Sequence, residues 1–275
     1  MDQKQRLRFL TEAFIRDSGD DEQIPVPEDP AEQKRVLRSL MNIRMPKPLP
    51  ENVLTVQDEY LRTLAVDKGV VTLKDIPVIK DAFGSSHAFG DILSLWQGDI
   101  TRLSCDAVVN AANSRMLGCF VPMHICIDNC IHTFAGIQLR EACYQKMEEQ
   151  KALFGSGYEQ PTAVPMLTDA YNLPSRKVIH IVGPIVCDTL TKEIERQLSD
   201  CYRNTLDLCR ENDLRSVAFC CISTGVFRFP NDRAAQIAVD TVTAWLRENP
   251  TVMDRVVFNV FKDEDLRIYR TLLQS

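Results

Sequence analysis

The sequence lacks any apolar run that approaches the roughly 20 residues a helix needs to cross a bilayer. Its first residues, MDQKQRLRFL, are charged, and no apolar signal core follows them. All ten cysteines lie between Cys105 and Cys221, several of them in apolar strand-like runs, which is typical of reduced thiols in a cytosolic protein. We therefore expect a soluble, cytoplasmic protein with no membrane partner.

An excess of positive charge is also missing. Lys and Arg total 32 against 38 Asp and Glu, which gives a net charge of −6, and no long basic run occurs. Non-specific binding to nucleic acid is therefore disfavoured. An anionic ligand would have to be held by backbone N–H groups at loops and helix starts.

The first 88 residues contain no cysteine and carry much of the proline. Apolar residues share one face of a helix at residues 7–15 and of a second at residues 36–43, which Asp29-Pro30 would start well. A third helix is expected at residues 53–64. We predict that residues 1–88 form a mostly helical N-terminal extension packed on the core; the alternative is an independent interaction module.

From residue 92 the pattern changes to short β-prone runs separated by amphipathic helices. Strands are predicted there at residues 92–96, 107–110, 177–182, 217–222 and 256–260, and helices at residues 127–149, 191–211, 232–247 and 263–273; one further short strand is predicted before this region, at residues 69–73. Several of these strands are apolar without alternation, as strands covered on both faces tend to be. The order predicts an α/β protein with an α/β/α layered sheet.

The stretch GCFVPMHICIDNCIH, residues 118–132, gathers thiol and imidazole side chains. Cys119, His124 and Cys126 stand within eight residues, followed by Cys130 and His132. Zinc prefers such ligands, and three of them would leave one position open for water or substrate, as catalytic sites do. The alternative is buried cysteine and a satisfied core histidine. The spacing is not a standard zinc-finger spacing, and the residues alone do not choose among the five candidates.

Four blocks flank this stretch in a recognisable order. They are LWQGDITRL at residues 95–103, DAVVNAANS at 106–114, KVIHIVGP at 177–184 and CISTGVFRFP at 221–230. Together they resemble the macrodomain, the ADP-ribose-binding fold, in the subclass that removes ADP-ribose from proteins. The resemblance implies a three-layer α/β/α macrodomain with a mixed central sheet over residues 89–275.

One segment departs from the common pattern of hydrolytic macrodomains, a run of glycines followed by V-D-G-C-I-H. Cys130 and His132 match the usual ending, whereas Cys119, His124 and Cys126 belong to the altered part. That part resembles the zinc-dependent macrodomains of microbes, which are often encoded beside a sirtuin-type ADP-ribosyltransferase. The resemblance implies one zinc per chain, held by those three residues.

The same resemblance assigns roles in holding the ligand. Asp99 would accept a hydrogen bond from the adenine amino group while Ile100 packs and donates from its backbone; the alternative for Asp99 is a capping role. The diphosphate would be held by the loop Ser223, Thr224, Gly225, Val226 and Phe227, whose small residues let successive amides face it. Phe227 would lie against the distal ribose or be core, and Arg228 stands where the family commonly has glycine.

Three polar residues are implied near the distal ribose. Asn110 and Asn113 resemble asparagines that hold the loop and reach toward this sugar, Asn113 being the better candidate; the alternative is a hydrogen bond to the local backbone. Asp128 matches the acid that would orient or deprotonate a water, and its alternative is to cap a helix that begins near Cys130. Zinc could lower the pKa of a bound water to about 7, or polarise a distal-ribose oxygen.

These expectations imply a zinc-dependent hydrolase that releases mono-ADP-ribose from a modified protein side chain. An acidic side chain is favoured because an ester linkage suits metal-activated water. The partners would be ADP-ribose and an ADP-ribosylated protein, by resemblance a lipoyl-carrier protein. The alternatives are an ADP-ribose reader with a structural zinc, an esterase acting on O-acyl-ADP-ribose, and a thiol-nucleophile enzyme using Cys126 or Cys119.

Overall fold

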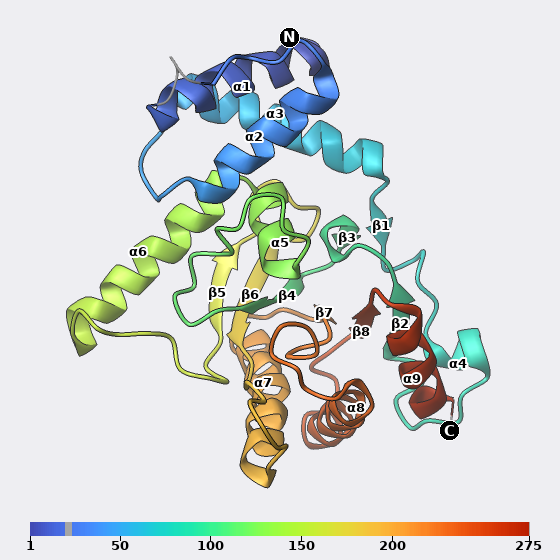
Figure 1. The fold of residues 1–275 in the computed structure, drawn as a ribbon. Coiled ribbons are helices and arrows are strands. Elements are labelled where there is room, and N and C mark those ends of the chain that lie inside the picture. Colours follow the sequence, from blue (N-terminus) through green and yellow to red (C-terminus); the bar gives the residue numbers. More distant parts are fainter. Residues whose placement is uncertain (20–23, 275) are drawn as a thin grey trace. The chain divides into compact units, whose positions relative to one another are not determined.

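A computed structural model describes residues 1–19 and 24–274, and the chain divides into two units (Figure 1). The first unit is formed by Met1–Gly69, Leu117–Tyr158 and Ala170–Leu173, and the second by Val70–Met116, Glu159–Asp169 and Pro174–Ser275. Each unit therefore takes three separate segments of the chain. The boundary expected at residue 88 stays a prediction.

Three helices form in the N-terminal segment of the first unit because its apolar residues recur at helical spacing. They are α1 (Gln3–Ser18), α2 (Pro30–Ile43) and α3 (Glu51–Lys68), which confirms the helices expected there. Pro30 opens α2, and the Asp29 carboxylate accepts a hydrogen bond from the Glu32 backbone N–H at 3.1 Å. The apolar faces of the three helices share a core that includes Leu10, Phe14 and Leu37.

A glycine splits the helix that was predicted over residues 127–149. α5 (Ile127–Ala135) ends at Gly136, whose φ is 95°, and α6 (Ile137–Phe154) begins at the next residue. A Cβ atom at Gly136 would lie 2.8 Å from the side chains of Gln57 and Gln138, so both the conformation and the space require glycine. The prediction of one continuous helix is therefore wrong. Within this unit α2 and α3 pack against α5.

The second unit is built on a six-stranded sheet with the order β2-β8-β7-β4-β6-β5. Its strands are β2 (Leu93–Gln97), β4 (Ala107–Ala112), β5 (Met166–Asp169), β6 (Lys177–Val182), β7 (Ser216–Phe219) and β8 (Arg255–Val260). All neighbours pair in parallel except β5, which is antiparallel to β6, so the expected mixed sheet is confirmed. β4, β6 and β7 are buried almost throughout, as their apolar sequences indicate.

The helices predicted in the second unit form in the expected order as α7 (Lys192–Glu211), α8 (Asn231–Glu248) and α9 (Asp263–Leu273). The short α4 (Ile79–Phe83) was not predicted. α7 packs against β6 and α8, and α9 against β2 and β8. The strand predicted at residues 69–73 is the short β1 (Val71–Thr72), which pairs with β3 (Leu103–Ser104). The strand predicted at residues 217–222 ends at Phe219, and β5 was not predicted.

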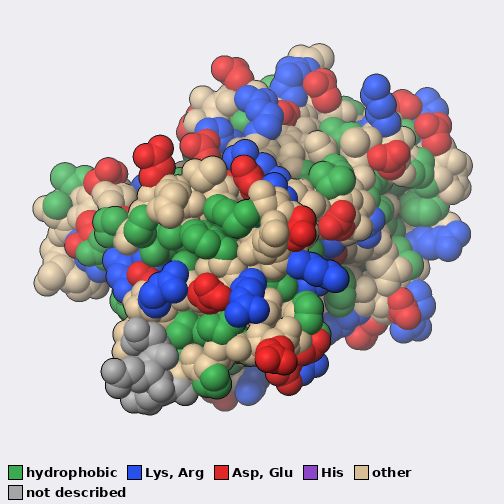
Figure 2. Space-filling model, turned by 90° about the horizontal axis from the view of Figure 1, so that it is seen from above, with side chains coloured by type: hydrophobic (Ala, Val, Ile, Leu, Met, Phe, Trp, Pro, Cys, Tyr) green, Lys and Arg blue, Asp and Glu red, His purple; other side chains and the backbone are tan. Residues whose placement is uncertain are grey.

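The surface carries charges of both signs. On the face shown in Figure 2, Lys and Arg side chains are interspersed with Asp and Glu side chains and with hydrophobic groups. None of the helices in the described part of the chain combines the length and the apolar character needed to span a membrane.

Candidate functional site

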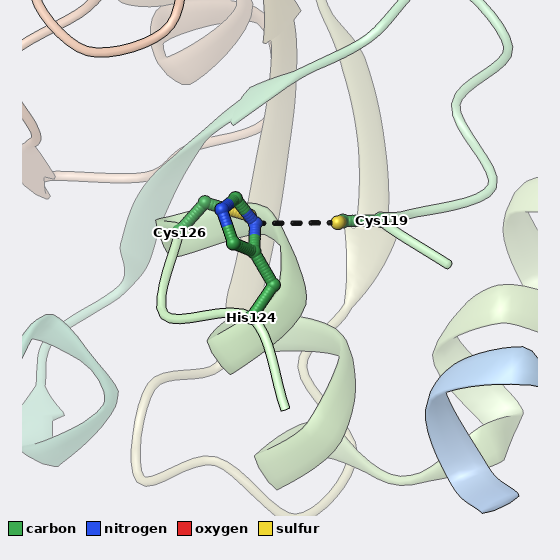
Figure 3. Close-up of side chains that lie close together, drawn as sticks. All are labelled: Cys119, His124 and Cys126. Atoms are coloured by element: carbon green, nitrogen blue, oxygen red, sulfur yellow. Dashed lines mark hydrogen bonds between the residues drawn. The ribbon is translucent and has the colours of Figure 1, made fainter. Parts of the chain in front are cut away.

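The three predicted zinc ligands come together in the first unit, on the segment that leads into α5 (Figure 3). Cys119 Sγ lies 3.5 Å from His124 Nδ1, and the ligand atoms of Cys119, His124 and Cys126 all lie within 4.8 Å of one another. Each of the three side chains is half-buried. Cys130 and His132 are not members of this group.

The donor set fits zinc. Two thiolates and one imidazole are ligands that zinc prefers, and two donors on a tetrahedral zinc lie about 3.5 Å apart. The separation of Cys119 Sγ and His124 Nδ1 is therefore the one that a shared ion requires. Three protein donors also leave the fourth position of a tetrahedral ion for a ligand from outside the chain.

Glycine is required immediately before the first ligand. Gly118 has φ of 81°, and a Cβ atom there would lie 2.8 Å from the His132 ring. The buried His132 ring itself lies 3.6 Å, from Nε2 to Oδ1, from the Asp128 carboxylate one turn earlier in α5. Residues 118–126, which we call the ligand segment because they carry the three candidate zinc ligands, therefore begin directly against the ring of this histidine.

The Cys126 thiol is tuned by its surroundings. Burial raises its pKa to about 12, and the neighbouring Cys119 and Asp128 act in the same direction. A thiol with such a pKa is protonated at neutral pH and is a poor nucleophile. The thiol-nucleophile alternative at Cys126 is therefore disfavoured, whereas a bound cation would favour the thiolate that a metal ligand requires.

Asp128 lies in the first turn of α5 and is buried. The helix N-terminus favours a negative charge there. α5 begins at Ile127 and its cap is Cys126, whose Sγ accepts a hydrogen bond from the Asn129 backbone N–H at 3.4 Å. The alternative in which Asp128 caps a helix near Cys130 is therefore wrong.

The remaining predicted site residues belong to the second unit and follow its parallel strands. Asp99 and Ile100 follow β2, Asn113 follows β4, and the loop from Ser223 follows β7. Because these strands are parallel, their carboxyl ends meet at one edge of the sheet, where open α/β sheets bind ligands.

Asp99 caps a short 3₁₀ helix, as its alternative role predicts. Its Oδ1 accepts hydrogen bonds from the Thr101 backbone N–H at 3.0 Å and from Thr101 Oγ1 at 2.6 Å, and Ile100 is buried beside it. The Asn259 side chain donates to the Gly98 carbonyl at 3.0 Å and fixes the approach to this turn. The adenine-binding role of Asp99 stays a prediction.

The predicted diphosphate loop is held in a tight turn. Arg228, where the family commonly has glycine, keeps a left-handed φ of 58°, and Ser223 has φ of 65°. Phe229 N–H donates to the Ser223 carbonyl at 3.0 Å. A Cβ atom at Gly183 would lie 2.1 Å from Ser223 Oγ, so the loop lies directly against the end of β6. At Gly225 the space for a Cβ atom is open, which leaves the backbone accessible.

The two asparagines of the second block behave differently. Asn110, inside β4, is fully buried, and its Nδ2 lies 3.1 Å from His180 Nδ1 in the neighbouring strand β6. Asn113 lies beyond the strand, and its Oδ1 accepts from the Arg115 N–H at 3.1 Å. The local backbone bond weighed as an alternative is therefore present at Asn113, whose ligand role stays a prediction.

Arg38, Asn42 and Asn129 contact the ligand segment and were not predicted from the sequence. Arg38 and Asn42 lie in α2, and their contacts to His124 and Met123 span more than 80 positions, so no local pattern connects them. Asn129 stands where the common macrodomain pattern has glycine, and this difference was the signal that could have found it.

Comparison with known proteins assigns this chain to a family. A family model described as Macro domain matches residues 109–238. A protein-ADP-ribose hydrolase of Treponema medium is 45% identical over 99% of this chain and all of its own length. One from Staphylococcus aureus is 41% identical, over 98% of this chain and 96% of that protein. The chain therefore belongs to the macrodomain family.

Solved structures agree with this assignment. A Trypanosoma brucei macrodomain in complex with ADP-ribose matches 86% of this chain and 94% of its own with a TM-score of 0.63 and 28% identity. An Oceanobacillus iheyensis macrodomain with ADP matches 67% of this chain and 92% of its own chain, with a TM-score of 0.58 and 37% identity. The expected fold class, an α/β macrodomain with a mixed sheet preceded by a helical extension, is confirmed.

Proposed function

We propose that this protein is a zinc-dependent hydrolase that removes mono-ADP-ribose from modified protein side chains. The observation that carries the zinc dependence is the convergence of Cys119, His124 and Cys126, with two donors 3.5 Å apart. The hydrolase activity is supported by relatives named protein-ADP-ribose hydrolase that match nearly the full chain at 45% and 41% identity.

The second unit would hold the ADP-ribose. Asp99 and Ile100 would bind the adenine, and Asn113 would reach the distal ribose. The diphosphate would lie on the backbone amides of Ser223, Thr224, Gly225, Val226 and Phe227. Solved relatives with ADP-ribose and with ADP support this ligand class, and binding at strand carboxyl ends is the general rule for such sheets.

Zinc held by the three ligands would supply Lewis-acid chemistry to the bond that is cut. Asp128 would orient or deprotonate the attacking water, since its buried carboxylate lies in the first turn of α5, two residues after the Cys126 ligand. An ester to an acidic side chain is the proposed linkage because its carboxylate is a good leaving group. A lipoyl-carrier protein is the proposed modified partner and the cytoplasm the proposed location.

The test compares the native protein with protein stripped by a chelator and protein reloaded with zinc. Zinc per chain is measured by elemental analysis, and release of ADP-ribose is followed on a protein modified at Glu or Asp. We expect about one zinc per chain, loss of turnover on stripping and recovery on reloading. Full activity without metal would refute the zinc role.

Two variants test whether zinc is needed for hydrolysis but not for ADP-ribose binding. Cys119→Ala should lose zinc and turnover and keep ADP-ribose affinity in calorimetry, whereas Cys187→Ala, at an exposed cysteine in the second unit, should match the native protein. Binding without hydrolysis in the native protein would favour the reader alternative. Activity on free O-acyl-ADP-ribose alone would favour the esterase alternative.

A further inference from the structure

Arg38 extends from α2 to the segment that carries the zinc ligands, within the first unit. Its Nη2 donates to the His124 carbonyl at 2.8 Å and to Asn129 Oδ1 at 3.0 Å, and it lies 3.8 Å from Cys130 Sγ. One guanidinium nitrogen therefore ties the main chain of a ligand to the side chain of a residue in α5. A guanidinium has only donors and no acceptor, so Arg38 is the donor in both hydrogen bonds.

Asn129 links the other two ligands. Its side chain is fully buried, and Nδ2 donates to the Cys119 carbonyl at 3.2 Å and to the Val121 carbonyl at 3.0 Å. Its backbone N–H donates to Cys126 Sγ at 3.4 Å. Asn129 thus holds the main chain of the first ligand and the sulfur of the third, while Arg38 fixes the orientation of its amide.

Asn42, one turn after Arg38 in α2, supports the same network. Its Oδ1 accepts from the Met123 N–H at 3.0 Å, and its Nδ2 donates to Thr133 Oγ1 at 2.9 Å. Met123 immediately precedes the ligand His124 and has a left-handed φ of 59°, a conformation that a side chain of this size rarely adopts. The bond from Asn42 therefore stabilises an unfavourable backbone conformation beside a ligand.

We propose that Arg38, Asn42 and Asn129 are positioning residues for the zinc ligands, so that the N-terminal extension is a working part of the metal site. The inference rests on the proposed zinc-dependent function. The ligand segment has no helix or strand between Gly118 and Cys126, and the turn bond from the His124 N–H to the Val121 carbonyl at 3.2 Å orders only part of it. The polar contacts from α2 and α5 converge on all three ligands and supply that order.

A purely architectural role for Arg38 is disfavoured by the packing of the extension. α1, α2 and α3 are held together by their own apolar core, to which Leu37 and Leu40 of α2 contribute. Arg38 is only partly buried, and its Nη2 contacts go to the ligand segment and to α5. Its removal should therefore disturb the ligands more than the fold.

The test is the zinc affinity of Arg38→Ala, Arg38→Lys and Asn129→Ala, measured by competition with a chromophoric chelator. Arg35→Ala, on an exposed arginine of the same helix, is the matched control. Loss of a group that orients metal ligands typically weakens binding about 10- to 100-fold. We expect a loss of that size for the two alanine variants, a smaller loss for Arg38→Lys, and native affinity for Arg35→Ala.

The absorption spectra of the Co²⁺-loaded proteins report on the geometry of the metal ligands, which would not change if Arg38 only stabilised the fold. We expect the d–d bands of Arg38→Ala to shift and weaken, while its ADP-ribose affinity and the thermal midpoint of its metal-free form match the native protein. Equal zinc affinity and identical Co²⁺ spectra in native, Arg38→Ala and Arg38→Lys proteins would overturn the inference, even if Asn129→Ala failed to fold. A native protein that binds no zinc would instead overturn the proposed function.

Discussion

Replacing the buried His180 with glutamine is expected to remove a large part of the acid sensitivity of folding. His180 lies in β6, with Nδ1 3.1 Å from Asn110 Nδ2 and Nε2 3.0 Å from Thr168 Oγ1. An amide nitrogen only donates, so Nδ1 accepts and the neutral ring carries its proton on Nε2. The ring is fully buried between neighbouring strands of the sheet.

The magnitude follows from the pKa of this ring. Burial lowers the pKa of His180 to about 3, whereas an unfolded histidine titrates near about 6.5. Below that pH the unfolded chain binds a proton that the folded chain does not, so the free energy of unfolding falls; above it the contribution is complete. The slope approaches about 1.4 kcal/mol per pH unit only once the unfolded ring is protonated, so lowering the pH from about 6.5 to about 4.5 should cost about 2 kcal/mol.

Urea unfolding of the native protein and of His180→Gln across this pH range measures the effect. The difference between the two curves isolates His180 because the other titrating groups are shared. His87→Gln is the control: burial and Arg247 also lower the pKa of that half-buried ring, and its removal should take away a smaller part of the slope. Parallel curves for the native protein and His180→Gln would refute a neutral ring in the folded state.

Three further substitutions have defined outcomes. Gly118→Ala places a Cβ atom 2.8 Å from the His132 ring at a left-handed φ; it should lose zinc and about 1–3 kcal/mol of stability, measured by elemental analysis and urea unfolding. Gly183→Ala drives a methyl group into Ser223 Oγ and should weaken ADP-ribose binding about tenfold in calorimetry with zinc retained, a change of about 1.4 kcal/mol. Asp128→Asn should keep zinc and lower kcat at least about 100-fold if the carboxylate acts on water; an unchanged kcat would remove it from the mechanism.

The order of elements was predictable because most strands and helices have strong patterns. The mostly apolar β6 and the amphipathic α9 were predicted with their observed bounds. The wrong predictions concern element ends that are determined by contacts between residues far apart in the sequence. Gly136 breaks a helix because Gln57, far away in the sequence, occupies the space of a side chain. β7 stops at Phe219 because the chain must turn to reach Ser223 in its left-handed conformation.

The candidate zinc ligands were predictable because they are local. Cys119, His124 and Cys126 lie on one short segment, so their residue types alone suggested a group. Arg38 was not predictable, because its contact to His124 spans 86 positions. Long-range hydrogen bonds to a backbone carbonyl require no particular residue type at the acceptor, and they leave no pattern in a single sequence.

Because the first unit is built from three segments that are separate in the sequence, it can complete its folding only late in synthesis, and N-terminal truncation would remove part of it. Its helices α1–α3 leave the ribosome first, yet Gln57 and Asn42 meet their partners only after α5 and α6 have emerged. At elongation rates of about 5–20 residues per second that interval lasts on the order of ten seconds. During this interval the polar side chains of α2 and α3 that later become buried are hydrated. A truncated protein that starts at α4 would lack Arg38 and Asn42, so the ligand segment would lose the hydrogen bonds that these residues make to it.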